Sequence, residues 1–132
     1  MKRKMIVMAA ALLLLASILL PATESLAAVL DAGGDCDMTV SGKEVTYSGS
    51  TTSSKSEDII RVTVTLWEKR NGTWHSISSV TKTKENAISV SKSKTVTVSG
   101  GHYYKVTADH YVQTGSNSST TNSYTSSVWI PN

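Results

Sequence analysis

The chain has 132 residues, with 13 Lys and Arg, 10 Asp and Glu, and a formal net charge of +3. Lys2, Arg3 and Lys4 precede an apolar run, which is the pattern of a targeting segment that is removed from the mature protein. The remainder carries ten basic and nine acidic side chains. We therefore expect no nucleic-acid partner, because binding to nucleic acid needs a concentrated basic surface.

Residues 1–27 have the layout of a cleaved secretory signal peptide. Residues 5–20 are almost wholly apolar, and the small side chains of Ser25 and Ala27 lie three and one positions before the expected cut. We place cleavage after Ala27, with Ala28 as a close alternative. The apolar run of about 16 residues is shorter than the roughly 20 needed to span a membrane. We therefore expect a secreted, extracellular protein with no membrane span after cleavage.

Residues 28–37 are expected to form a flexible N-terminal lead, and they contain the one cysteine, Cys36. A single cysteine cannot form a disulfide within its own chain, so it is either a free thiol or one half of an intermolecular disulfide. Asp35 and Asp37 flank it and disfavour the reactive thiolate. Both alternatives remain open, and the second predicts a Cys36-linked dimer.

The chain after residue 27 is typical of an all-β protein. It contains 12 Val and 5 Ile against 2 Leu and 4 Ala, and 35 of its 105 residues are Ser or Thr. Branched side chains fit a pleated, half-buried sheet, whereas good helix formers are scarce here. A disordered Ser/Thr-rich tract would lack aromatic residues, yet all eight Trp and Tyr residues lie in this part.

We expect one β-sandwich domain over residues 38–130, built from seven antiparallel strands. The expected strands are 38–41, 44–51, 60–67, 74–83, 88–98, 102–113 and 124–130. Residues 115–121 are expected to be a polar loop. Asn71 and Gly72 tolerate the positive φ of a tight hairpin turn, and the irregular spacing of Trp74 and Ile77 after that turn indicates a β-bulge.

The segment Tyr104-Lys105-Val106-Thr107-Ala108 resembles the Tyr-x-Val-x-Ala strand of immunoglobulin-like and fibronectin type III sandwiches. The resemblance implies a single seven-stranded antiparallel sandwich of that kind, with the Tyr104 hydroxyl capping a corner. The chain is also similar to short secreted proteins of Gram-positive bacteria whose function is uncharacterised. That similarity lies in the Trp-x-x-x-Asn-Gly-x-Trp hairpin that ends at Trp74 and in a late Tyr-Tyr-x-Val strand.

Sequence patterns that indicate catalysis or metal binding are absent. The chain has no Gly-x-Ser-x-Gly, His-Glu-x-x-His or Cys-x-x-Cys motif and no Gly-rich phosphate loop. His102 and His110 lie eight residues apart on one expected strand, roughly 26 Å at the rise of a strand, so they cannot share a metal ion. We therefore expect no enzymatic activity, no cofactor and no metal site.

One group of side chains suggests a binding surface. In the expected sandwich, strand 102–113 lies between strands 60–67 and 124–130, and alternation turns Trp67, Tyr103 and Trp129 to solvent at one pole, with Lys105 below them. Exposed aromatic rings of this kind stack on sugar rings or anchor a protein partner. The alternative is that the aromatic pairs only stabilise the sheet.

The sequence therefore predicts a secreted, non-enzymatic binding module that acts at the cell envelope or in the extracellular matrix. Its ligand-binding residues would be Trp67, Tyr103, Trp129 and Lys105, and its partner a cell-wall polysaccharide or an extracellular protein. The alternative is a self-associating matrix protein, or a secreted effector or antagonist, including the Cys36-linked dimer. The expected oligomeric state is a monomer or a weak homo-oligomer.

Overall fold

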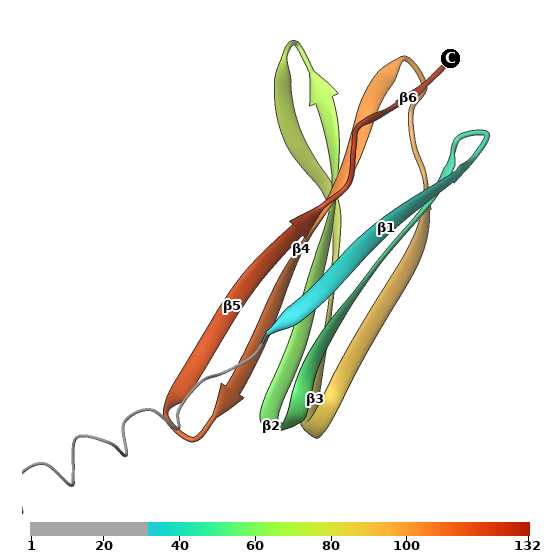
Figure 1. Ribbon diagram of the computed structural model, residues 1–132. Helices are drawn as coiled ribbons and strands as arrows, with labels where there is room; N and C mark the ends of the chain where they lie inside the picture. Colours follow the sequence, from blue (N-terminus) through green and yellow to red (C-terminus); the bar gives the residue numbers. More distant parts are fainter. Residues whose placement is uncertain (1–31) are drawn as a thin grey trace, which may run out of the picture.

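The computed structural model describes residues 32–132, and this part of the chain is all-β (Figure 1). Its six strands are β1 (Gly33–Ser41), β2 (Glu44–Arg70), β3 (Thr73–Thr97), β4 (His102–Thr114), β5 (Asn117–Tyr124) and β6 (Val128–Ile130). The expected signal peptide, with its cleavage after Ala27 or Ala28, lies outside the described residues. Within residues 32–132, no helical segment has the length and apolar character of a membrane span.

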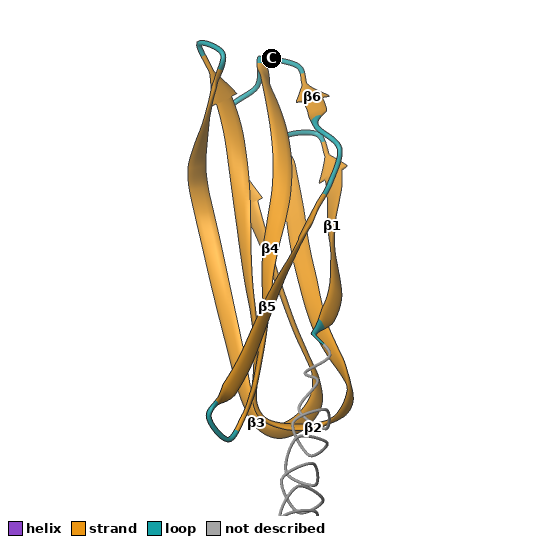
Figure 2. Cartoon of the chain, turned by 60° about the vertical axis from the view of Figure 1, so that its left-hand side comes forward, coloured by secondary structure: helices purple, strands orange, loops and turns teal. Residues whose placement is uncertain are grey.

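The long strands β2 and β3 pair with each other from one end to the other and organise the sheet. β1 pairs with the first part of β2, β4 pairs with its second part, and β5 and β6 both pair with β4; every pair is antiparallel. The β2–β3 register shifts between Thr52 and Glu57. There the sheet curls until its two halves face each other (Figures 1 and 2).

We name these halves by their strands. The first layer contains β1, residues 44–52 of β2 and residues 89–97 of β3. The second layer contains residues 57–70 of β2, residues 73–87 of β3, and β4, β5 and β6. The molecule is thus one continuous, curled antiparallel sheet of six strands, rather than seven separate strands, because β2 and β3 each pass through the bend without a break.

The core lies between the layers and follows the alternation expected for strand 60–67. The buried apolar side chains of β2 and β4 point inward, and the residues between them are mostly half-buried or exposed. The fully buried members on these two strands are Val45, Tyr47, Ile60, Val62, Val64, Leu66, Tyr104, Val106 and Val112. Burial of each large apolar side chain contributes about 1.5–3 kcal/mol, so this core stabilises the curl.

Gly49 brings the two layers close together. A Cβ at this position would lie 2.7 Å from Cγ2 of Val64 and 3.2 Å from Cγ2 of Val62, both on the opposite layer. Contacts under 3.0 Å are essentially never made by real Cβ atoms. The glycine therefore lets β2 pack directly onto the apolar side chains of its own second half.

The expected flexible lead over residues 28–37 is wrong for its last five residues. Residues 33–37 form the first half of β1 and pair with residues 48–52 of β2. Gly34 crosses directly over the buried His110, where a Cβ would overlap both the imidazole ring and the backbone oxygen of Ser50. Residues 33–37 therefore belong to the packed sheet, because the glycine at position 34 allows β1 to lie close to His110 and Ser50.

The expected polar loop over residues 115–121 is also wrong in part. Asn117 to Thr121 belong to β5, which pairs with β4 in an unbroken register from Thr114↔Asn117 to Thr107↔Tyr124. The sequence concealed this strand because it contains almost no apolar residue. Backbone pairing to β4 forms it, and burial of apolar side chains contributes little.

Three local expectations are confirmed. Asn71 and Gly72 form the β2–β3 turn with φ of 50° and 78°, and the register shift after Leu66 is the expected bulge. The Tyr104 hydroxyl reaches the backbone oxygen of Ser99, five residues upstream. That contact is the corner cap that the Tyr-x-Val-x-Ala resemblance implied.

The two neighbouring glycines of β1 provide a test of this packing. Gly34→Ala should lower the free energy of unfolding by about 1–3 kcal/mol, because the new Cβ has no space between Ser50 and His110. Gly33→Ala is the matched control, since its Cβ would come no closer than 3.4 Å to Thr52. Urea denaturation of both variants measures the difference, and equal losses would contradict the close approach at Gly34.

Candidate functional site

The outer surface of the second layer carries the aromatic residues. Paired residues of neighbouring strands share a face, and the register joins Trp67 with Lys105, Lys69 with Trp74, Tyr103 with Trp129, and Thr107 with Tyr124. We call this surface the aromatic face. It consists of Trp67, Trp74, Tyr103, Tyr124 and Trp129 together with Lys69 and Lys105.

Tyr103 and Trp129 form the contact that the sequence predicted. Their ring centroids lie 5.1 Å apart at an interplanar angle of 62°, an edge-on arrangement that aromatic pairs favour. The two residues remain 45% and 51% exposed. An edge-on pair that leaves about half of its surface in water offers aromatic surface to a ligand.

Trp67 lies on the same face but is held differently. Its indole Nε1 donates a 2.8 Å hydrogen bond to Oγ1 of Thr107, and its side chain is half-buried. It lies opposite Lys105 in the register, and no ring stacking with Tyr103 or Trp129 is found within residues 32–132. Of the expected aromatic trio, the structure therefore brings two rings into contact and leaves the third beside them.

Two members of the aromatic face were missed by the sequence analysis. Trp74 joins it because the bulge beside Ile77 restores the outward direction of the β3 side chains. Tyr124 joins it because β5 is a strand, and it is the most exposed of the large hydrophobic residues described, at 81%. The bulge is a usable signal for Trp74. Unbroken alternation over the expected strand 124–130, with Trp129 outward, turns Tyr124 inward instead; this expectation is wrong because β5 ends at Tyr124 and β6 begins only at Val128.

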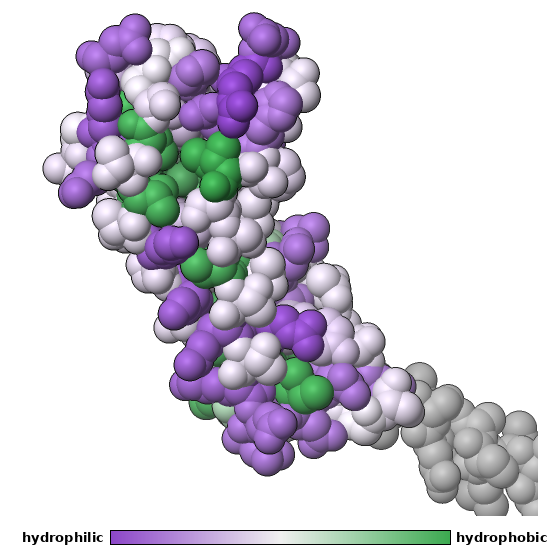
Figure 3. Space-filling model, turned by 180° about the vertical axis from the view of Figure 1, so that it is seen from behind, coloured by the Kyte–Doolittle hydropathy of each residue, from purple (hydrophilic) through white to green (hydrophobic). Residues whose placement is uncertain are grey.

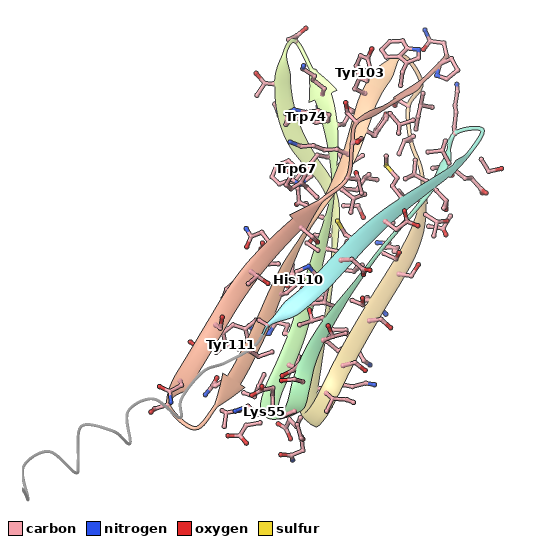
Figure 4. All side chains as sticks on the ribbon, in the orientation of Figure 1. Lys55, Trp67, Trp74, Tyr103, His110 and Tyr111 are labelled. Carbon is pink, nitrogen blue, oxygen red and sulfur yellow. The ribbon has the colours of Figure 1, made fainter. Side chains whose placement is uncertain are left out.

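The cations of the face gather around Trp74. The Lys105 ammonium lies 4.5 Å from the centroid of the Trp74 ring and that of Lys69 lies 5.8 Å from it, both within the range of cation–π attraction. Figure 4 shows Trp67, Trp74 and Tyr103 toward one end of the molecule and Tyr111 toward the other. The face thus combines exposed rings with positive charge at one end.

Between the layers, His110 of β4 lies within hydrogen-bonding distance of side chains on β2 and β5, and Gly34 of β1 passes close to its ring. Its Nδ1 lies 2.9 Å from Oγ1 of Thr51, and its Nε2 lies 2.8 Å from Oγ of Ser123. Because the Thr51 hydroxyl donates its only proton to the Arg61 carbonyl, it must accept from Nδ1–H, and Nε2 then accepts from Ser123. Burial lowers the pKa of His110, although Asp35 and Asp109 act in the opposite direction.

Cys36 points toward the same interior region. Its Sγ lies 3.8 Å from the backbone oxygen of Val106, and the residue is half-buried. Burial raises the pKa of the thiol, and the neighbouring carboxylates of Asp35 and Asp37 act in the same direction. This environment does not favour an intermolecular disulfide, and the Cys36-linked dimer stays a prediction.

Two hollows open on the described part of the molecule. One, of about 700 Å³, lies between the two parts of β3 and contains Glu68, Arg70 and His102. Glu68 is bonded to both Arg70 and Tyr104; burial raises the pKa of this carboxyl, but these bonds outweigh burial and lower it overall. Figure 3 shows from behind that hydrophobic residues gather mainly toward the upper end of the molecule.

The other hollow, of about 650 Å³, lies on the first layer and is lined mainly by Ser side chains with Asp35 and Asp37. Within residues 32–132, no group of three His, Cys, Asp or Glu side chains is placed to hold a metal ion. The aromatic face therefore remains the surface with the most distinctive chemistry in the described chain.

Comparisons with known proteins give distant likenesses. No protein-family model and no curated protein matches the chain. It is similar to the solution structure of R. palustris CsgH, with TM-score 0.43 and 18% identity over 70% of this chain and 90% of that one. It is also similar to Spo0M, a sporulation control protein from Bacillus subtilis, with TM-score 0.44 and 16% identity over 76% of this chain and 49% of that one.

The expected kinship with short secreted proteins of Gram-positive bacteria stays a prediction.

His110 predicts a pH dependence of stability. Its pKa is lowered in the folded protein, so the unfolded chain takes up the proton first as pH falls through about 6.5. The free energy of unfolding should therefore decrease below that pH, by up to about 1.4 kcal/mol per pH unit. Urea denaturation between pH 7.5 and 5.0 should show this slope.

His110→Gln should flatten the pH dependence of the free energy of unfolding, whatever its effect on stability at neutral pH. His75→Gln is the control: this histidine is exposed, so its replacement should leave the pH dependence unchanged. A slope that survives in His110→Gln would assign the effect to another group.

Proposed function

We propose that this protein is a non-enzymatic binding module that acts outside the cell, at the cell envelope or in the extracellular matrix, and holds a polysaccharide on its aromatic face. The observation that supports this proposal is the gathering of five aromatic side chains on one sheet surface, three of them 45–81% exposed. The extracellular location rests on the N-terminal sequence alone.

The geometry of the face suits a chain of sugar rings. Tyr103, Trp129 and Tyr124 present exposed aromatic surface, and such surface packs against the apolar C–H faces of sugars while the phenol and indole groups bond to hydroxyls. Small hydroxyl side chains surround the rings: Thr65 faces Ser79 and Thr107 on the neighbouring strands. An open sheet surface with hydrogen-bonding groups between its rings fits an extended polymer better than a small, enclosed ligand.

The charge of the face favours a polysaccharide with acidic groups. Lys69 and Lys105 are the charged members of the aromatic face, whereas the neighbouring Glu68 is buried beneath the sheet. Two ammonium groups beside exposed rings attract a carboxylate or phosphate on the ligand. The other ligand class is an extracellular protein, whose acidic and apolar surface groups could contact the same lysines and aromatic rings.

A second candidate function is self-association as a matrix protein, or a role as a secreted effector or antagonist. The observation that favours self-association is the Ser/Thr-rich outer edge of β5, a strand that the structure adds to the sheet. Association through that edge needs no Cys36 disulfide, which the interior position of the thiol disfavours.

Substitution of the exposed rings tests the proposed binding. Tyr124→Ala and Trp129→Ala should each weaken retention on insoluble, acidic cell-wall polysaccharide by about tenfold or more, the effect of losing an aromatic anchor worth 1.4 kcal/mol or above. Depletion assays with purified protein measure it. Both side chains are more than half exposed, so the fold should persist, as circular dichroism would verify.

Tyr111→Ala is the matched control. Tyr111 lies on the same surface of β4, but near its far end, and the Arg61 guanidinium covers its ring at 4.7 Å. We expect its retention to equal that of the wild type. Unchanged retention of both Tyr124→Ala and Trp129→Ala would remove the aromatic face as the binding site.

A further inference from the structure

The outer edge of β5 is an unguarded strand edge. β5 pairs with β4 on one side, and within residues 32–132 no backbone group of another strand pairs with its other side. Its sequence, Asn-Ser-Ser-Thr-Thr-Asn-Ser-Tyr, contains no charged residue and no proline. The β4–β5 register has no bulge. Each of these features leaves a strand edge able to pair with another strand.

The other long edges of the sheet are guarded by charge. β1 carries Asp35 and Asp37. The two free stretches of β3 carry Lys82 and Lys84 in the second layer and Lys92 and Lys94 in the first. Charged side chains on an edge strand prevent pairing of one molecule with another. Since every long edge except β5 carries them, the absence of charge there distinguishes this edge from the rest.

The contacts between β5 and β1 do not close this edge. They involve the inner side of β5, where the Thr121 hydroxyl donates at 3.1 Å to the carbonyl of Ala32, the residue directly before β1. Ser123, also inward, bonds to His110. β1 therefore packs beneath β5, against its inner face, and leaves the backbone groups in the plane of the sheet exposed.

The hydrogen-bonding pattern identifies which backbone groups are open. The Thr125 N–H donates to the Val106 carbonyl at 2.9 Å, and bonded pairs alternate along an antiparallel ladder. Odd-numbered residues of β5 therefore direct their N–H and C=O groups to β4. The even-numbered residues direct theirs to the open edge; they are Ser118, Thr120, Asn122 and Tyr124.

We propose that β5 pairs with β5 of a second copy of this chain, antiparallel and about a two-fold axis perpendicular to the sheet. Thr121 of one copy then lies opposite Thr121 of the other. This register opposes Thr120 to Asn122 and Ser118 to Tyr124, so that the open backbone groups of each pair face each other and share two hydrogen bonds. It is also the register that overlaps residues 118–124 fully.

A second copy fits this edge because the interaction is self-complementary. A two-fold interface opposes the same patch on both subunits, so like charges would meet if β1 or β3 paired with itself, whereas β5 opposes only hydroxyls, amides and one phenol. Thr120 and Asn122 side chains lie on the same face and can bond across the interface. The proposal does not depend on the ligand of the aromatic face.

Thr121, which lies opposite Thr121 of the second copy in the proposed dimer, provides a test by cross-linking. In the Cys36→Ser background, Thr121→Cys would place two sulfurs on a non-bonded pair whose Cα atoms lie about 4.5 Å apart, within disulfide range. Under mild oxidation, protein obtained by expression of the full chain should form a covalent dimer on non-reducing gels. Ser119→Cys, on the same face of β5, is the matched control and should not cross-link, because its counterpart lies four residues away.

Charge on the edge gives the second test. Sedimentation equilibrium of the wild type should show a dimer that dissociates in the micromolar-to-millimolar range expected of an interface below about 1,200 Å². Thr120→Lys/Asn122→Lys opposes lysines across the axis and should make the protein monomeric, while Ser93→Lys on the already guarded β3 should not. A wild type that stays monomeric at millimolar concentration would overturn the proposal, as would equal cross-linking of both cysteine variants.

Discussion

The pairing of β2 with β3 is the interaction on which the rest of the structure depends. Because these strands stay paired on both sides of the bend, the first layer and the second layer belong to one hydrogen-bonded sheet. The bend itself is stabilised by Glu57, which is 1% exposed and bonded to Ser53 and Thr114. Burial raises the pKa of this carboxyl, but its hydrogen bonds outweigh burial and lower it overall, so the charged form is the one that the bend holds.

This bend also determines where the aromatic face lies. Thr114 is the last residue of β4 before the turn to β5, and Asp58 accepts a 2.7 Å hydrogen bond from the Gly115 N–H of that turn. β5 is therefore fixed at the far end from the aromatic rings and runs back toward them, which places Tyr124 next to Thr107. An acidic side chain at one end of the sheet thus contributes to the position of an aromatic ring at the other.

The hydrophobic pattern predicted the parts of the fold that are buried on one face. Strand 60–67, the hairpin at Asn71 and the corner at Tyr104 were recognisable because apolar alternation, turn chemistry and a local motif each act over a few residues. The beginning of β1 and most of β5 were not recognisable. Their side chains are small and polar, and they become strands because a neighbouring strand offers backbone partners, which is information that no local pattern contains.

The candidate site was predictable only in part, for the same physical reason. Tyr103 and Trp129 followed from alternation on strands with clear hydrophobic patterns. The outward direction of Trp74 depends on the bulge in β3, which changes the alternation of side chains after the hairpin turn. The outward direction of Tyr124 depends on the pairing of β5 with β4. A shift of one residue in strand register moves a side chain to the opposite face. Side-chain directions that depend on pairing with a distant strand therefore cannot be predicted from local sequence.

The aromatic face and the open edge of β5 meet at Tyr124, and this has a consequence for binding. In the proposed dimer, a two-fold axis perpendicular to the sheet keeps both aromatic faces on the same side of one sheet. A polymer long enough to contact both faces would gain from the high effective concentration of the second site. Such a ligand binds the dimer more tightly than the monomer, so by linkage it must also strengthen a weak self-association. A module with a modest dimer affinity and a modest affinity for each sugar segment would then assemble where its polymer is present.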